Sequence, residues 1–365
     1  MSLETIRPDS VGGFAPLEII KNIQQAGFTI KTQRPLADVL AESTKKVGSF
    51  PYKTYAEVQT TLENLASTYS FASLFSMGKS LQGRELWTLR LNTTAQGMQP
   101  SSKPGCVLMA TIHTREHLAT VFALRLAEYL CSNYDSTLQQ LDIYITPLWN
   151  PDGNEYDLSG NPYRCYRKNM RINPDRSIGV DLNRNFGFVW GSTGASAVFT
   201  SDTYRGPYPF SEPETKAFKQ FIEHRNNIKT FASYHTYGEL IIYPWGHTSA
   251  PLQNSLDRRV HVTLARNMAK ITGYTPQQAS KLYLTSGDAV DWTYGARGII
   301  SFTLELIPQL YGQIGCSGFY PTNQTIIDDA IAKNIDAALY LLNITANPYK
   351  SIPIDDECYE DEIVV

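Results

Sequence analysis

The chain contains the stretch CVLMATIHTREHLATVFALRLAEYLC, residues 106–131, in which two apolar segments enclose the polar sequence His-Thr-Arg-Glu-His. Residues 106–112 form a short apolar run of the kind found in buried strands. Residues 118–131 carry apolar side chains at helical spacing over more than three turns. The stretch therefore predicts a strand followed by a helix, with charged and imidazole side chains at the junction.

The same alternation continues on both sides. We expect helices at residues 55–69, 213–225, 260–272 and 326–342, and strands at 86–91, 141–148, 228–234 and 298–306. Short apolar strands alternating with longer helices are typical of α/β proteins. We predict an α/β fold with three layers, α/β/α, around a central twisted sheet that is mixed and mostly parallel.

The 365 residues, 42% of them hydrophobic, suffice for a substantial core. We divide them into an N-terminal extension (1–50), a main domain (51–345) and an acidic C-terminal tail (346–365). The net charge of -3, without a basic stripe, predicts no nucleic-acid partner. Apolar runs are too short to span a bilayer, so we expect no membrane partner. We expect a monomer.

The N-terminal residues and the cysteines bear on the compartment in which the protein works. Residues 1–4, Met-Ser-Leu-Glu, do not begin a secretory signal, so we expect a cytoplasmic protein, or a secreted one whose signal and propeptide have been removed. The five cysteines are odd in number and lack C-x-x-C spacing. They are Cys106, Cys131, Cys165, Cys316 and Cys358. We expect mostly free thiols, with the first two buried; a cysteine nucleophile would lack a matching local motif.

Polar candidates stand at or near the carboxyl ends of three predicted strands. His113 and Glu116 follow the strand 106–112, His235 follows residues 231–234, and Glu305 lies within Ile300-Ser-Phe-Thr-Leu-Glu-Leu306. Open α/β sheets bind ligands at this edge. His113 and Glu116, three residues apart at a turn, can bind one ion.

With His235 they make two histidines and one carboxylate, the donor set of catalytic zinc sites that leave a fourth position for water. Zinc lowers the pKa of such a water to about 7, and a separate carboxylate can take its proton. We therefore predict one Zn²⁺ per chain and Glu305 as the base.

The same residues allow other interpretations. H-x-x-E occurs by chance, and His113-Thr-Arg-Glu-His117 also fits a motif in which both histidines bind zinc and the glutamate is the base. That motif requires a helix, whereas this one straddles a strand end. Glu305 could instead belong to a buried ion pair. His224, His247 and His261 are interpreted as surface or packing residues.

Several separated blocks extend the pattern. They are His113-Thr-Arg-Glu-His117, Asn150-Pro-Asp-Gly153, Arg167-Lys-Asn169, Gly179-Val-Asp-Leu-Asn-Arg-Asn185, Tyr204-Arg-Gly206, His235-Thr-Tyr-Gly-Glu-Leu240, Tyr283-Leu-Thr-Ser-Gly287, Asp291-Trp292 and Phe302-Thr-Leu-Glu305. In this order they resemble the M14 family of zinc carboxypeptidases, most closely the bacterial carboxypeptidase T type, over about residues 50–345.

The resemblance implies a catalytic role for each matching residue. His113, Glu116 and His235 match the zinc ligands, and Glu305 matches the general base that later protonates the leaving amine. Arg167 matches the side chain that polarises the scissile carbonyl and stabilises the oxyanion. Residues 51–345 would then be the catalytic domain.

The resemblance also implies substrate contacts. Asn183 and Arg184 match the pair that grips the free α-carboxylate, a task that suits a guanidinium. Tyr283 matches a mobile tyrosine that closes over the bound residue, and Arg115 matches a secondary carboxylate contact. Val290 matches the base of the side-chain pocket, and Asp288 lies two residues before it.

Val290 favours apolar and aromatic C-terminal side chains, and Asp288 would admit basic ones. We expect broad specificity, apolar and aromatic first. Residues 177–178 and 199–202 lack the cysteines of the disulfide found in pancreatic relatives, so cysteine usage does not indicate secretion.

The leading hypothesis is an exopeptidase acting on peptide or protein C-termini. The alternatives are a zinc amidase or deacylase, or a cell-wall peptide trimming enzyme, on the same fold. A third hypothesis, a catalytically silent binding module, predicts a missing ligand or base, and none is missing.

Overall fold

A central sheet of eight strands organises the computed structural model, which describes residues 2–7, 10–14, 17–30, 52–160, 163–307 and 315–352. In spatial order the strands are β3 (Ala72–Lys79), β4 (Glu85–Leu91), β6 (Asp142–Thr146), β5 (Gly105–Ala110), β7 (Ile228–Thr236), β10 (Ile300–Leu306), β8 (Leu240–Tyr243) and β9 (Thr275–Gln278). The central strands β6, β5, β7 and β10 run parallel, and antiparallel pairs flank them. The mixed, mostly parallel sheet is confirmed.

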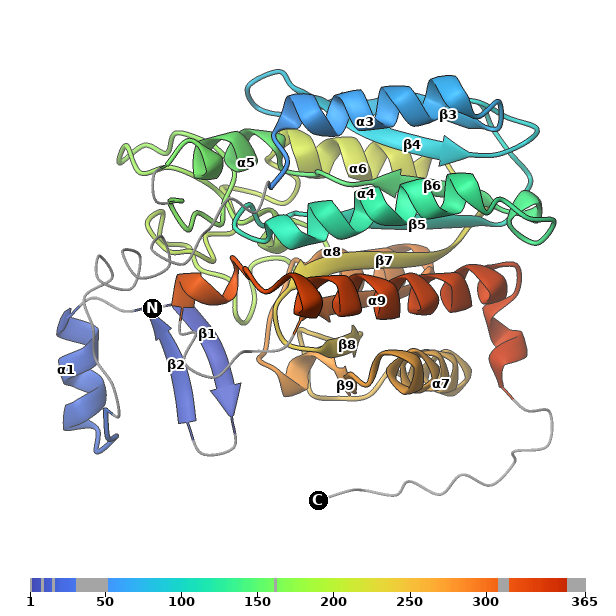
Figure 1. Ribbon diagram of the computed structural model, residues 1–365. Coiled ribbons are helices and arrows are strands. Elements are labelled where there is room, and N and C mark those ends of the chain that lie inside the picture. The colour runs from blue at the N-terminus through green and yellow to red at the C-terminus, as the bar shows by residue number, and fades with distance from the viewer. Residues whose placement is uncertain are drawn as a thin grey trace.

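Helices cover both faces of the sheet, which confirms the three layers (Figure 1). One face carries α3 (Tyr55–Thr68), α4 (His117–Ser132), α7 (Ser255–Thr272) and α9 (Gln324–Thr345); the other carries α6 (Pro213–Glu223) and α8 (Ala289–Arg297). Each face has its own apolar cluster, so the strands between them are buried on both sides. This burial explains why β5 is apolar along its length rather than alternating, and why every residue of β6 is buried.

Smaller elements complete the described chain. Helix α5 (Pro151–Leu158) follows β6, and short 3₁₀ turns are η1 (Leu138–Gln140), η2 (Leu182–Arg184), η3 (Ala279–Lys281), η4 (Gly315–Gly318) and η5 (Pro348–Ser351). The segment predicted as an N-terminal extension contains an antiparallel pair, β1 (Ser2–Arg7) and β2 (Ser10–Phe14), and α1 (Leu17–Gln25). Of the predicted tail, residues 346–352 are described, and the acidic residues 355–362 lie outside the described residues.

Every predicted helix and strand has a counterpart, but boundaries moved and some elements were missed. Helix α7 begins at Ser255 rather than at residue 260, because the Asn254 side chain accepts hydrogen bonds from the amides of residues 256 and 257. Strands β3, β8 and β9 and helices α5 and α8 were not predicted. Except for β3, they have four to nine residues, too few to give a clear periodicity.

The expectation of mostly free thiols is wrong for two cysteines. Cys165 and Cys316 form a disulfide across 151 residues of sequence. Cys106 and Cys131 are buried and free, as predicted, and Cys358 lies outside the described residues. Spacing along the chain could not reveal the pair, because its two segments meet only through tertiary packing.

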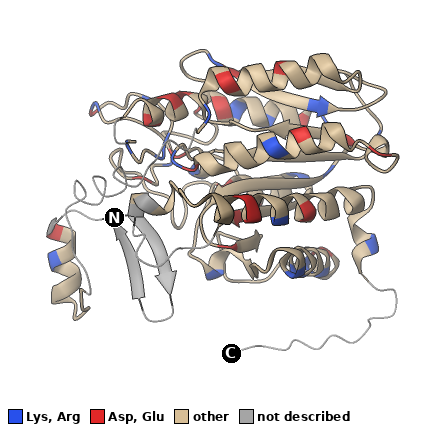
Figure 2. Cartoon of the chain, in the orientation of Figure 1, with Lys and Arg blue, Asp and Glu red and all other residues tan. Residues whose placement is uncertain are grey.

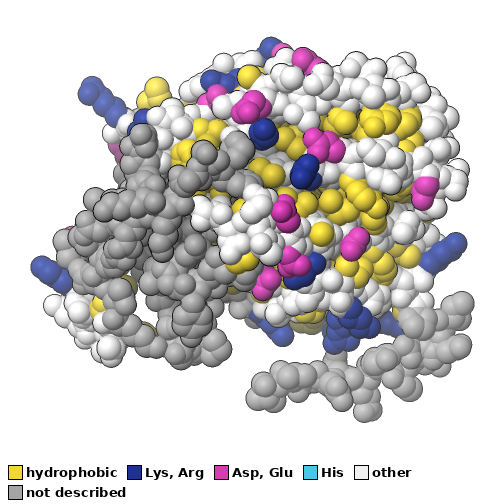
Figure 3. All heavy atoms as spheres, in the orientation of Figure 1, with side chains coloured by type: hydrophobic (Ala, Val, Ile, Leu, Met, Phe, Trp, Pro, Cys, Tyr) yellow, Lys and Arg dark blue, Asp and Glu magenta, His cyan; other side chains and the backbone are white. Residues whose placement is uncertain are grey.

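Positively and negatively charged residues are interspersed along the described chain (Figure 2). On the face shown in Figure 3, apolar side chains lie scattered between charged ones. No helix among the described residues is long and apolar enough to cross a membrane.

His261 couples α7 to the sheet and gives the fold a pH dependence. Its buried ring donates from Nδ1 to the Asp257 carbonyl, at 2.8 Å, and accepts at Nε2 from the Ser301 amide, at 3.2 Å. Burial lowers the pKa of His261 to about 4, while the Asp257 carbonyl opposes the shift. An unfolded chain therefore binds a proton below about pH 6.5 that the folded chain binds only near pH 4.

We predict that the neutral His261 ring contributes roughly 3 kcal/mol to the free energy of unfolding above pH 6.5. This contribution decreases progressively as the pH falls toward 4. His261→Gln should be less stable at pH 7.5 and should lose less stability between pH 7.5 and pH 5 in urea unfolding. The exposed His224→Gln is the control and should keep the wild-type pH dependence. Equal pH dependence in both variants would contradict the assignment.

Candidate active site

The connection from β5 to α4 places the first polar cluster. At the end of β5, Thr111 adopts a positive φ of 55°, and its hydroxyl bonds to that of Thr120, at 2.6 Å. The Glu116 amide then donates to the His113 carbonyl, so the chain turns back before α4 begins. This turn brings the side chains of His113 and Glu116 together, as their spacing predicted.

Gly153 in α5 allows a close approach to this turn. A Cβ at this glycine would lie 2.2 Å from Thr114 Cγ2 and 2.7 Å from the Lys168 carbonyl oxygen. The Thr114 amide donates to the Arg167 carbonyl, at 3.2 Å, and its hydroxyl donates to the Tyr166 carbonyl. The segment that carries Arg167 is therefore fixed directly to the turn that carries His113 and Glu116.

Three buried side chains that can bind a metal ion converge on one point. Glu116 Oε1 lies 2.8 Å from His113 Nδ1, and Glu116 Oε2 lies 2.9 Å from His235 Nδ1. One donor atom of each residue lies within 4.8 Å of the others. His235 reaches this point because β7 is the sheet neighbour of β5. Two imidazole nitrogens and one carboxylate fit Zn²⁺ with a fourth position open.

Charge and hydrogen bonding support this fit. Burial opposes ionisation of Glu116, but His113 and His235 outweigh it and hold the pKa of Glu116 well below its ordinary value. Burial, together with the charge of Arg167, lowers the pKa of His113, which favours the neutral ring that binds metals. The pKa of His235 moves the other way, because burial, which would lower it, is outweighed by Glu116, which raises it. The ionised Glu116 and the neutral ring of His113 are the protonation states that a zinc site needs, and a bound metal ion would replace the proton of His235.

The remaining ring nitrogens of the two histidines have partners that the sequence reasoning missed. Ser233 Oγ forms a hydrogen bond with His235 Nε2 at 2.9 Å, whereas Asp181 Oδ1 lies 3.3 Å from His113 Nε2 as a charged neighbour outside hydrogen-bond geometry. Such partners orient a ligand imidazole and select its tautomer. Asp181 lies within the block of residues 179–185, which was the available signal. Ser233 shares a strand with His235 but carried no distinguishing pattern.

The alternative with His117 as a ligand does not fit the structure. Its ring nitrogens lie 2.9 Å from Asn154 Oδ1 and 2.7 Å from Asp157 Oδ2, and its ring stacks on Tyr52. Both nitrogens are thus engaged away from Glu116. His117 is a packing residue at the start of α4.

Glu305 lies beside the donor cluster. On the parallel strands β10 and β7 it is paired in register with His235, so the two side chains share one face of the sheet. Burial raises the pKa of Glu305 to about 8, with the charge of Glu116 adding to the shift and His235 and Arg167 opposing it. A carboxyl group with a raised pKa can both accept and donate a proton near neutral pH.

Arg167 faces the same cluster. Its Nε and Nη2 donate to Asp181 Oδ2, at 3.1 and 2.9 Å, and its Nη1 lies 4.0 Å from Glu116. Burial disfavours its charge, but Asp181 overrides that effect and raises the pKa of Arg167. Asp181 therefore touches both a candidate zinc ligand and the candidate oxyanion residue.

The predicted substrate residues lie on several elements around the cluster. Arg184, on η2, is buried with Nη1 4.0 Å from Asp181, and Asn183 Oδ1 accepts from the amide of residue 289 in α8. Tyr283 is exposed, and its ring lies 5.8 Å from the Arg184 guanidinium carbon. Arg115 pairs with Asp202 at 3.3 Å. Val290 and Asp288 are buried at the start of α8.

Comparison with known proteins agrees with this geometry. The family described as zinc carboxypeptidase (Peptidase_M14) matches residues 58–333. The chain belongs to the zinc carboxypeptidase family. Its members are hydrolases of peptide bonds, so the family identifies the chain as a metallocarboxypeptidase and implies zinc and peptide substrates.

Individual relatives show the extent of the similarity. A zinc carboxypeptidase of Saccharothrix mutabilis subsp. capreolus is 34% identical over 308 residues, covering 80% of this chain and 69% of that protein. Carboxypeptidase A1 of Rattus norvegicus is 30% identical over 307 residues, covering 79% and 70%. The crystal structure of carboxypeptidase A from Helicoverpa armigera is similar with a TM-score of 0.76 and 28% identity, covering 90% of this chain and 86% of that one.

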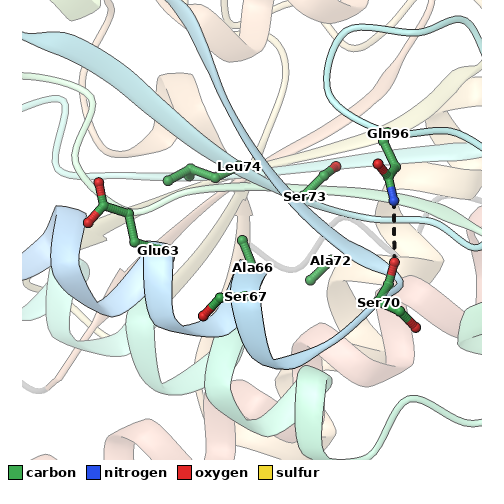
Figure 4. Close-up of a pocket in the computed structure, with 8 residues that line it drawn as sticks. All are labelled: Glu63, Ala66, Ser67, Ser70, Ala72, Ser73, Leu74 and Gln96. Carbon is green, nitrogen blue, oxygen red and sulfur yellow. Dashed lines mark hydrogen bonds between the residues drawn. The ribbon is translucent and has the colours of Figure 1, made fainter.

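Figure 4 shows a separate hollow in this zinc carboxypeptidase. It has a volume of about 540 Å³ and lies between α3 and the first residues of β3, with Glu63, Ser70 and Gln96 among its lining residues. Ala72 pairs with Leu91, and Leu91 pairs with Ile143 at the start of β6, so the hollow is at the opposite sheet edge from His113. It holds no imidazole, and we assign it no part in the chemistry.

Asp181 should contribute to zinc affinity. Asp181→Asn removes the negative charge beside His113, and we expect zinc to bind about 10- to 100-fold more weakly in competition with a chelator. Asp202→Asn, which changes a carboxylate paired with Arg115, is the control and should alter affinity by less than about twofold. Equal affinities for the two variants would show that Asp181 does not support the ligand.

Proposed function

We propose that this zinc carboxypeptidase is an exopeptidase that removes single residues from the free C-termini of peptides. The main support is the placement of Arg184. Its Nε donates to the Gly194 carbonyl at 3.2 Å and its Nη1 to the Asn183 carbonyl at 2.7 Å, which orients the guanidinium beside Tyr283. An oriented, buried arginine next to the zinc ligands suits a substrate carboxylate.

In this proposal, His113, Glu116 and His235 hold Zn²⁺. Bound there, the ion would act as a Lewis acid toward the scissile carbonyl and lower the pKa of its water to about 7. Arg167, already oriented by Asp181, donates hydrogen bonds to the oxygen on which charge develops.

Glu305 takes the proton of the attacking water and passes it to the departing amine. Its raised pKa supports this shuttle, because the group must hold a proton between the two transfers. Asn183 and Arg184 bind the terminal carboxylate, Arg115 makes a secondary contact with it, and Tyr283 closes over the bound residue. Tyr283 has the exposure that such a movement requires.

The pocket supports broad specificity with apolar and aromatic residues preferred. Val290 packs in an apolar cluster with Ala289 and Trp292, so the pocket base lacks a charge of its own. Asp288 adds a polar group to the pocket, because its Oδ2 is buried without a hydrogen bond. The absence of a side chain at Gly246 leaves space beside this oxygen, since a Cβ there would lie 3.2 Å from it. Burial, with the Asp291 carboxylate adding to it, raises the pKa of Asp288 to about 8.

A panel of blocked dipeptides tests the exopeptidase proposal. We expect cleavage of those with a free C-terminal carboxylate, and cleavage of amidated counterparts slower by at least about 100-fold, because Arg184 and Asn183 lose their partner. A zinc chelator should abolish both. Glu305→Gln provides a control that keeps zinc and loses turnover. Equal cleavage of the amidated set would favour the amidase or deacylase alternative.

The pocket carboxylate predicts a pH-dependent preference. Asp288 is mostly neutral below pH 8 and ionised above it, so basic C-terminal side chains should gain relative to leucine as the pH rises from 6.5 to 9. The measurement is the ratio of kcat/KM for a C-terminal Arg substrate to that for a C-terminal Leu substrate. Because both substrates use the same zinc ligands and Glu305, titrations of these groups cancel in the ratio. Asp288→Asn should remove the rise, and a persistent rise would place the responsible group elsewhere.

A further inference from the structure

Asn169, two residues after Arg167, is a fully buried amide that joins two segments of the candidate site. Its backbone amide donates to the Val180 carbonyl at 3.0 Å, and its Oδ1 accepts from the Val180 amide at 2.8 Å. Val180 directly precedes Asp181, the carboxylate that bonds to the Arg167 guanidinium. The chain beside Arg167 and the chain beside Asp181 are therefore held together by two hydrogen bonds to one residue.

The other end of the Asn169 side chain is held by a buried carboxylate. Asn169 Nδ2 donates to Glu212 Oε2 at 2.8 Å, and Glu214 Oε2 accepts from the same nitrogen at 3.3 Å. Glu212 is fully buried, and its oxygens also accept from Arg171 Nε, at 2.8 and 3.0 Å, and from the Ser211 hydroxyl, at 2.6 Å. Because both oxygens of Glu212 have donors, the cost of burying its charge is offset and the carboxylate is a fixed anchor for Asn169.

The position of Glu212 in the sequence shows that helix formation does not require this contact. Glu212 is the N-cap residue of α6, where Asn, Asp, Ser or Thr usually accepts hydrogen bonds from the first turn, but its side chain makes no such bond. Its carboxylate turns to Asn169 and Arg171 instead. The Glu212 amide donates to Asn185 Oδ1 at 3.2 Å, and Asn185 directly follows Arg184. Departures of this kind from a local preference are expected where a residue serves a functional site.

The backbone that carries Arg167 is fixed on both sides. The Thr114 amide donates to the Arg167 carbonyl at 3.2 Å, which ties it to the turn that carries His113 and Glu116. Asn169 ties the residues that follow to Val180 and, through its side chain, to the anchor at α6. The direction of the guanidinium depends on how the chain places Arg167 relative to Asp181, and Asn169 sets that relation.

We propose that Asn169, held by the buried carboxylate of Glu212, is a positioning residue for Arg167. Asn169 acts through the backbone, and keeps the guanidinium where charge develops on the oxygen of the scissile carbonyl. This inference rests on the role of Arg167 in the proposed function. A displacement of a catalytic group by about 1 Å can lower a rate by about 100-fold, so the loss of Asn169 should appear in the chemical step rather than in substrate binding.

The first test is Asn169→Ala, measured at saturating zinc on a blocked dipeptide with a free C-terminus. We expect kcat to fall by about 10- to 100-fold while KM changes by less than about threefold. A phosphonate analogue of the dipeptide, whose tetrahedral oxygens stand where the oxyanion forms, should bind more weakly by the same factor as kcat falls. The product leucine, which places no oxygen at that position, should bind within about twofold of the wild type.

Asn334→Ala is the matched control, because it removes another fully buried amide, one that donates to the Tyr274 hydroxyl in a different part of the fold. It should lower stability and leave kcat and phosphonate affinity within about twofold of the wild type. Equal losses of kcat in the two variants would overturn the inference. So would a loss of leucine affinity in Asn169→Ala as large as its loss of phosphonate affinity.

A paired exchange tests the contact with Glu212 and does not depend on the stability of the alanine variant. Asn169→Asp places two carboxylates where a 2.8 Å hydrogen bond stood, and adding Glu212→Gln supplies the donor from the other side. We expect the double variant to recover at least about tenfold of the kcat lost in Asn169→Asp. A double variant no more active than Asn169→Asp would overturn the inference.

A second background shows whether Asn169 acts through Arg167. In Arg167→Lys, which has lost the oriented guanidinium, Asn169→Ala should lower kcat by less than a further factor of about two. A full additional loss would show that Asn169 acts elsewhere. Equal cleavage of free and amidated C-termini by the wild type would instead reject the exopeptidase function and leave these comparisons intact, because Arg167 would face the carbonyl of either substrate.

Discussion

The buried carboxylate of Glu116 is the constraint on which the active site depends. An ionised group inside a protein needs opposite charge or hydrogen-bond donors, and Glu116 has one imidazole on each oxygen. His113 is near because the chain turns directly after β5, and His235 is near because β7 lies next to β5. A change in strand order would separate the histidines and leave a buried charge without partners. A zinc ion held by the three side chains would satisfy the same carboxylate and both rings at once.

Asp181 extends this arrangement outward. It lies beside His113 and bonds to Arg167, with Arg184 4.0 Å away, so one buried carboxylate connects three residues to which we assign different roles: zinc ligand, oxyanion contact and substrate-carboxylate contact. Its pKa stays well below the ordinary value, because the two arginines and His113 outweigh the effect of burial. The positive charges of Arg167 and Arg184, which would repel each other, are thereby held in fixed orientations. Such preorganisation is a main source of catalytic power.

Two packed clusters lie beside the residues of the candidate site. The cluster under α6 and α8 contains Val290, and the cluster around Tyr52 contains Cys316, Phe319 and Tyr320. Of the three candidate zinc ligands, His235 lies on β7, where sheet hydrogen bonds fix the backbone, and His113 and Glu116 lie on the turn between β5 and α4.

The sequence by itself determined the main helices and strands and the layer architecture, and it singled out His113, Glu116 and His235, which the fold brings together. Apolar runs and helical spacing are local signals, and the strand-end position of His113, His235 and Glu305 follows from them because parallel strands share one carboxyl edge. The blocks of residues 113–117 and 179–185 added the family resemblance. Arg167 was assigned only by that resemblance, since a single arginine has no local pattern that distinguishes it.

Tertiary structure alone decided how residues distant in sequence pair. The rejection of His117 as a ligand depended on Asn154 and Asp157 occupying its ring nitrogens, and the Cys165–Cys316 bond depended on two segments 151 residues apart meeting. The support given by Asp181 and Ser233 likewise became visible only once the rings were oriented. Periodicity records what each residue does within its own helix or strand, whereas these contacts are set by the order of strands in the sheet and the packing of loops at its edge.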